Sequence, residues 1–171
     1  TFAPGSTLKA IGDDAFREIG ALTNISIPAS VTSIGYGAFA GNPELTSVTV
    51  DSANPSYSSI DGVLFNKDAT GLIQYPAKKS TTSYSIPTGV TSIGDSAFAE
   101  ATGLTAIGIP STVTSIGNNA FLRAAKLESL TLPASIQSIG VGAFMQKFSL
   151  KSIAVSYTHL RAHETGRNLV C

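Results

Sequence analysis

The sequence has 171 residues, of which 43% are hydrophobic and only 13% are charged. Lys and Arg together number 11, as do Asp and Glu, so no net charge draws the chain towards nucleic acid or an acidic membrane. No apolar run approaches the roughly 18 residues that a membrane-spanning helix needs. Cys171 is the single cysteine, which excludes an internal disulfide framework.

A short repeat with a constant spacing organises most of the chain. Phenylalanine marks it at Phe16 and Phe39, and again at Phe98, Phe121 and Phe144. A fixed period of about 23 residues, with apolar residues in register, predicts a stacked solenoid. We expect the five Phe side chains to form a buried ladder in which each ring stacks on the next. Asp95 and Asn118, on the adjoining turns, are expected to tolerate substitution at a cost below about 0.5 kcal/mol.

The first two units extend from Leu8 to Pro28 and from Val31 to Val50. Each contains a segment such as 22–27, in which β-branched residues alternate with small polar ones, and this period of two predicts a short half-buried strand. The Ala-Phe pair is expected to lie in a short helical or 3₁₀ turn. A glycine precedes each of these turns and is expected to take a turn conformation or to allow close backbone approach: Gly12, Gly35, Gly94, Gly117 and Gly140.

The register changes between Val50 and Pro87. The step from Phe39 to Phe98 is longer than two regular steps, so an enlarged unit of about 36 residues takes the place of a regular one. Two β-rich runs, 61–66 and 72–76, flank the five residues 67–71 and predict a hairpin. This enlarged unit, at about 51–87, is either a larger loop that bridges two coils or a protrusion that binds a partner.

The repeat pattern ends at Val155. We therefore divide the chain into a solenoid, 1–155, of five regular units plus the enlarged one, and a non-repeat tail, 156–171. We interpret the tail as translated adaptor read-through and exclude it from function. It holds His159, His163 and Glu164, whose spacing would suit a metal on one helix face. Because these residues lie wholly in the excluded tail, we assign no metal and no cofactor.

The aligned units read Leu-x-x-Ile-x-Ile-Pro-x-x-Val-x-x-Ile-Gly-x-x-Ala-Phe. This pattern, over roughly residues 6–155, resembles the BspA-type leucine-rich repeats of bacterial surface proteins. The enlarged unit is similar to an interruption common in that family. The resemblance implies an α/β leucine-rich-repeat solenoid, curved and right-handed, with short parallel strands on the concave side and short helical or 3₁₀ turns opposite. Ser30, Thr112 and Ser135 stand where ordinary leucine-rich repeats place Asn, so we expect no full asparagine ladder.

The repeats offer little for catalysis. A Ser nucleophile needs a His or Lys base beside it, and residues 1–155 contain no His. The adjacent acids Asp13 and Asp14 are interpreted as a solvated turn. We therefore expect a non-enzymatic interaction module, with a passive spacer as the alternative and a carbohydrate-acting enzyme as the least supported reading. The resemblance implies a location at the cell surface or outside the cell.

The expected partner is a protein or cell-surface ligand, bound by a monomeric chain. On each strand the residues that flank the inward Ile or Val should point to the concave face. The enlarged unit adds aromatic and basic side chains, which binding surfaces favour more than small polar ones. The candidate contact residues are Asn24, Ser26, Ser47, Thr49, Ser129 and Thr131 on the strands, with Tyr57, Tyr75, Lys78, Lys79 and Tyr84 in the enlarged unit.

Overall fold

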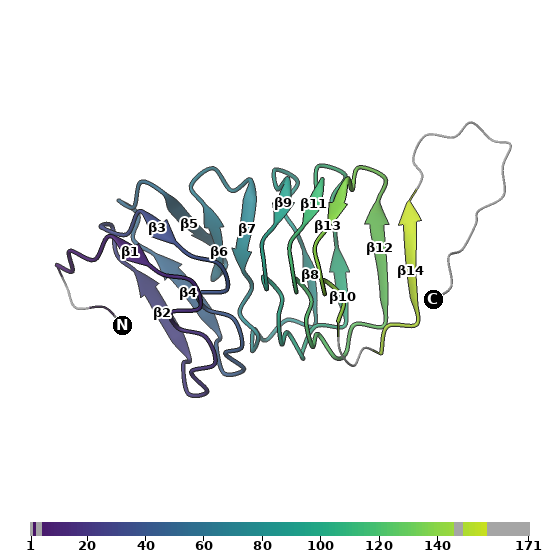
Figure 1. Cartoon of the computed structure of the whole chain (residues 1–171), viewed down its shortest axis with the longest axis horizontal. Coiled ribbons are helices and arrows are strands. Elements are labelled where there is room, and N and C mark those ends of the chain that lie inside the picture. The colour runs from purple at the N-terminus through teal and green to yellow at the C-terminus, as the bar shows by residue number, and fades with distance from the viewer. Residues whose placement is uncertain (1, 3–4, 146–148, 157–171) are drawn as a thin grey trace, which may run out of the picture.

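The computed structural model describes residues 2, 5–145 and 149–156, and in them the chain forms a β-solenoid of about six turns (Figure 1). Consecutive regular turns bring equivalent residues of adjacent repeats side by side, as Asn24 pairs with Ser47 and Ser129 with Ser152. The predicted stack of repeats is therefore confirmed. The two candidate histidine positions and the rest of 157–171 lie outside the described residues.

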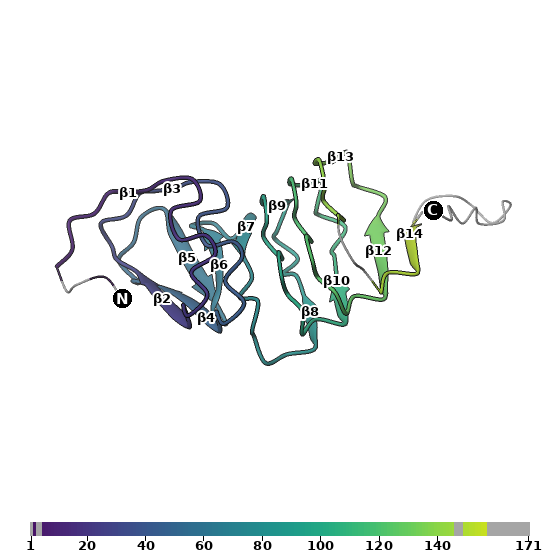
Figure 2. The ribbon, with the colours of Figure 1, turned by 60° about the horizontal axis from the view of Figure 1, so that its bottom comes forward.

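Each regular turn contributes strands on two opposite sides of the solenoid, and Figure 2 separates them clearly. The sequence predicts the first series, whose inward residues alternate with polar ones. It does not predict the second, because a two-residue strand is too short to show alternation. The first series is β2 (Asn24–Ile27), β4 (Ser47–Val50), β8 (Ser83–Ser85), β10 (Ala106–Gly108), β12 (Ser129–Pro133) and β14 (Ser152–Ser156). The second is β1 (Ala10–Ile11), β3 (Ser33–Ile34), β9 (Ser92–Ile93), β11 (Ser115–Ile116) and β13 (Ser138–Ile139).

The expected helical or 3₁₀ turns are wrong for the described residues, which contain no helix of either kind. In four of these turns two residues four apart have a positive φ, as Ser96 (55°) and Glu100 (60°) do, and such residues cannot continue a right-handed helix. Alternate N–H groups instead donate to the next repeat: Ser96 to the carbonyl of Asn118 at 2.8 Å and Phe98 to that of Ala120 at 2.7 Å. The turns therefore form a third ladder of hydrogen bonds along the stack.

Short polar side chains add to this turn ladder. Asp13 Oδ1 accepts from the N–H of Tyr36 at 2.8 Å, and Asp95 Oδ1 accepts from Asn118 at 2.7 Å. Asn118 in turn accepts from Val141 at 2.8 Å. The expectation that Asp95 and Asn118 are freely replaceable therefore needs correction, because each satisfies a backbone donor of the following repeat.

Hydroxyl groups replace the asparagine ladder of ordinary leucine-rich repeats. Ser30, Thr112 and Ser135 each donate to a backbone carbonyl of the preceding repeat, at 2.6–2.8 Å. The turn glycines allow close approach, as expected: a Cβ on Gly117 would lie 2.3 Å from Asp95 Oδ1. Gly12, in the first repeat, has nothing within 4 Å of its Cβ position.

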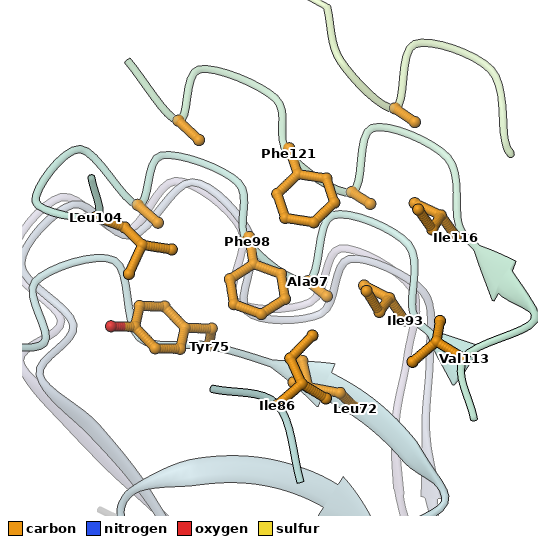
Figure 3. Close-up of a cluster of buried hydrophobic side chains, with 14 of the residues drawn as sticks. Leu72, Tyr75, Ile86, Ile93, Ala97, Phe98, Leu104, Val113, Ile116 and Phe121 are labelled. Atoms are coloured by element: carbon orange, nitrogen blue, oxygen red, sulfur yellow. The ribbon is translucent and has the colours of Figure 1, made fainter. Parts of the chain in front are cut away.

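The aromatic ladder occupies the core and is shown in part in Figure 3. Ring centroids of Phe98 and Phe121 are 5.1 Å apart with an interplanar angle of 9°. The expected ladder of five phenylalanines is interrupted between Phe39 and Phe98, where Tyr75 stacks on Phe98 at 5.1 Å. Tyr75 precedes Phe98 by one regular repeat length and is the ring of the enlarged unit. The end rings Phe16 and Phe144 stack on their neighbours but are only half-buried.

The enlarged unit forms a three-stranded antiparallel meander: β5 (Tyr57–Ile60), β6 (Val63–Asn66) and β7 (Gly71–Gln74). The predicted hairpin across 67–71 is confirmed as the β6–β7 pair. β7 then pairs in parallel with β9, so the meander continues the second strand series in one sheet of order β13-β11-β9-β7-β6-β5.

The meander also divides the core. Val63, Leu64 and Phe65 of β6 are all fully buried, although consecutive strand residues point to opposite faces. Leu64 packs in a cluster with the first two repeats, whereas Val63 and Phe65 pack in a cluster with the later ones. The enlarged unit therefore separates the two core clusters as an internal wall. This arrangement fits an element that bridges two coils better than it fits a protrusion that binds a partner.

Candidate functional site

The outward residues of the first strand series form a surface that we call the strand face. Register pairs Asn24 with Ser47 and Ser26 with Thr49 on β2 and β4. The Asn24 Oδ1 atom accepts from the hydroxyls of Ser47 at 2.8 Å and Thr46 at 2.9 Å, which orders this part of the surface. All of these side chains are small and uncharged, so the strand face offers hydrogen bonds and close approach rather than charge.

The strand face is not continuous. The first series consists of three separate pairs, β2–β4, β8–β10 and β12–β14. The structure therefore brings Asn24, Ser26, Ser47 and Thr49 together on one sheet and places the exposed Ser129 and Thr131 on another. The enlarged unit adjoins the first of these sheets, because the N–H of Val48 donates to the carbonyl of Gly62 at 2.8 Å.

The three candidate tyrosines of the enlarged unit differ in their surroundings. Tyr75 is only 1% exposed and bonds Thr81 at 3.0 Å, so its place among the surface contacts is corrected: its ring fills the Phe position of the core. Tyr57 is half-buried and its hydroxyl accepts from the N–H of Ile34 at 2.7 Å. Tyr84 is half-buried against Tyr75 and Phe98. Burial, followed by the charges of Tyr75 and Asp61, raises the pKa of Tyr84 to about 12.

Of the two candidate lysines, Lys78 links the enlarged unit to the preceding repeat and Lys79 makes a contact within the unit. Lys78 forms an ion pair with Glu44, and its N–H donates to the carbonyl of Leu45 at 2.8 Å. Lys79 donates from Nζ to the carbonyl of Asp61. Both ammonium groups thus already have partners within the chain. Their role as contacts with another molecule stays a prediction, and the sequence gives no sign of these long-range pairs.

The described residues contain no group of three or more His, Cys, Asp or Glu side chains that could hold a metal ion. No helix among them is long and apolar enough to cross a membrane. The expected solvated turn at Asp13 and Asp14 is exposed, and Asp14 pairs with Arg17 at 3.2 Å. What the described residues offer is a hydrogen-bonding surface on a stack of repeats.

A family model described as the BspA type leucine-rich repeat region, in 6 copies, matches residues 2–76 and 74–164. The chain belongs to this family. The enlarged unit of this BspA-type chain lies at the junction of the two matched segments. A comparison with curated proteins found no significant match.

Solved structures share the fold of this BspA-type chain. The pneumococcal vaccine antigen PcpA is 29% identical with a TM-score of 0.74, over 91% of this chain and 44% of that one. A leucine-rich repeat protein from Eubacterium ventriosum is also 29% identical, with a TM-score of 0.74, over 86% of this chain and 45% of that one. A leucine-rich cell surface protein from Faecalibacterium prausnitzii is 28% identical with a TM-score of 0.54, over 88% and 52%. The chain thus spans about half the length of these relatives.

Proposed function

We propose that this chain is a non-enzymatic interaction module of a bacterial surface or secreted protein and that it binds a protein or cell-surface ligand as a monomer. The similarity to a vaccine antigen and to a cell surface protein supports the location. The repeat family and fold, which are generally non-enzymatic, support the class of function.

The observation that carries the contact site is the ordered β2–β4 part of the strand face. Asn24, Ser26, Ser47 and Thr49 form an uncharged patch beside the enlarged unit. We further propose that Tyr57, Tyr84, Lys78 and Lys79 of that unit add contacts with the partner. A flat array of small hydroxyl and amide groups can approach a partner closely and gains affinity by extending over many contacts rather than through one hot spot. Ser129 and Thr131 repeat the same chemistry on β12.

The proposal is tested by displaying the chain on a non-adherent laboratory bacterium and measuring adhesion to cultured epithelial cells and to immobilised collagen and fibronectin. The double variant Ser26→Lys and Thr49→Glu places an attractive charged pair on the patch, so the strands stay paired while the surface changes. We expect adhesion to fall at least tenfold.

The matched control is Gln137→Lys with Ser138→Glu, two exposed positions at the start of β13 in the second strand series. It should leave adhesion within twofold of the parent chain. A displayed and folded chain that adheres no better than empty cells would instead favour the passive spacer. Equal losses in both double variants would show that added charge, and not the strand face, explains the effect.

A further inference from the structure

The turn ladder is interrupted at the enlarged unit. Leu72 pairs with Ile93, and Tyr75 stacks on Phe98. Ile93 and Phe98 are five residues apart in the sequence, but Leu72 and Tyr75 are only three apart. The turn of the enlarged unit is therefore two residues shorter than a regular one. A pocket of about 230 Å³ lies at this place, between the turn that contains Tyr36 and the turn that contains Asp95. We call this pocket the notch. Its lining includes Tyr36, Gly37, Phe39, Ile73, Gln74 and Asp95.

The two walls of the notch carry backbone groups that are paired wherever two regular turns adjoin in the described residues. The N–H groups equivalent to that of Gly37, at Asp14, Ser96 and Asn119, each donate to the following turn at 2.8–2.9 Å. Among the described residues the N–H of Gly37 has no acceptor, and neither has that of Phe39. Across the notch the carbonyl of Asp95 has no donor, although its equivalents in Tyr36, Asn118 and Val141 each have one.

An occupant that pairs with both walls must accept a hydrogen bond on one side and donate one on the other. A peptide main chain does this with consecutive C=O and N–H groups, and an exposed backbone edge is a known template for such pairing. An anion could satisfy only the donors. Elsewhere in the stack these groups pair with the backbone of an adjoining turn, so backbone is the chemistry they are placed to accept.

The charge around the notch narrows the choice further. Asp13 and Asp14 belong to the preceding repeat and do not line the notch: Asp13 Oδ1 accepts from the N–H of Tyr36 at 2.8 Å, and Asp14 pairs with Arg17 at 3.2 Å. Among the described residues that line the notch, Asp95 is the one with a charged side chain, and it stands on the wall opposite Gly37. This carboxylate is negatively charged, which favours a ligand with a Lys or Arg side chain.

We propose that the notch binds an extended, basic peptide segment of a partner protein, which completes the interrupted turn ladder. The segment accepts from the N–H of Gly37, donates to the carbonyl of Asp95 and places an apolar side chain against Ile73 and the exposed ring of Tyr36, which is 73% accessible. This inference rests on the proposed function, because it names the class of partner and a second contact site on the turn side.

The test starts from a phage-displayed library of random heptapeptides selected on the full chain. The enriched sequence is then synthesised with acetyl and amide ends, and its binding is measured by calorimetry and by amide chemical shifts. We expect a sequence with at least one Lys or Arg, and the largest shifts at Gly37, Phe39 and Asp95. A copy of the peptide methylated on its backbone nitrogens should bind at least tenfold more weakly, because it cannot donate to Asp95.

The matched variants are Tyr36→Ser and Val141→Ser. They occupy equivalent positions of two repeats and both are highly exposed, at 73% and 84%, so neither should affect folding. Tyr36→Ser should weaken the peptide at least fivefold and Val141→Ser less than twofold. The proposal is overturned if no peptide is enriched, if shifts gather on the strand face, or if the methylated copy binds equally well. None of these results depends on adhesion by the strand face, so the two proposals can fail separately.

Discussion

At the scale of single residues, the contacts between repeats depend on short polar side chains at fixed positions in the turns. Asp95 accepts from the N–H of Asn118, and Asn118 accepts from that of Val141. The side chains are themselves exposed or half-exposed, which is why a reading of the sequence treats them as solvated. Their importance comes from the backbone donor of the next repeat, which no local pattern reveals.

We expect Asp95→Ala to lower the free energy of unfolding by about 1 kcal/mol, since a net hydrogen bond contributes roughly 0.5–1.5 kcal/mol. Asp95→Asn is the control, because Asn118 shows that an amide oxygen performs the same role one repeat later. It should cost less than half as much. Urea denaturation of both variants measures the difference, and equal losses would show that the charge of Asp95, not its acceptor, matters.

At the scale of elements, the enlarged unit determines how the repeats are joined. The hairpin across 67–71 could be predicted because two β-rich runs flank a turn of Asp, Ala, Thr and Gly. β5 could not, because residues 57–60 contain two consecutive serines and no clear alternation. Nor does the sequence show that β6 is covered on both faces, since that depends on where the neighbouring repeats stack.

This internal wall predicts that adjacent residues of β6 are equally sensitive to truncation. Leu64→Ala should cost about 2–5 kcal/mol and Phe65→Ala about 3–5 kcal/mol, because each leaves a cavity in one of the two core clusters. Ile60→Ala, in the same meander but 40% exposed, should cost clearly less. Chemical denaturation checks all three. In a hairpin that protruded into solvent, one of the two β6 variants would be nearly neutral.

At the scale of the whole molecule, the repeat period predicts the stack, and the rest depends on contacts between distant segments. Tyr75 is an exception, because its position one regular repeat length before Phe98 is visible in the sequence and marks it as a ring of the ladder. The partners of Lys78 and Lys79 lie 34 and 18 residues earlier in the chain. Among the candidate contacts, the strand positions are those whose outward orientation follows from alternation in the sequence, and their role in binding stays a prediction.

The division of the core into two clusters has a consequence for how the molecule opens. In a solenoid each repeat contacts only its neighbours, so a defect should loosen the structure locally rather than everywhere. Phe39 lies in the core cluster of the first two repeats and Phe121 in the core cluster of the later repeats. Both side chains are at most 1% exposed. Truncation of either to Ala should cost about 3–5 kcal/mol.

We therefore expect the two truncations to differ in where they act. Phe39→Ala should accelerate native-state amide hydrogen exchange in β2 and β4 while leaving β11 and β12 near their parental rates. Phe121→Ala should do the reverse. The amides of β6 and β7 should respond to both, because the meander contributes residues to both clusters. If either variant accelerated exchange uniformly from β2 to β14, the chain would open as one cooperative unit and the wall would couple its two halves rather than separate them.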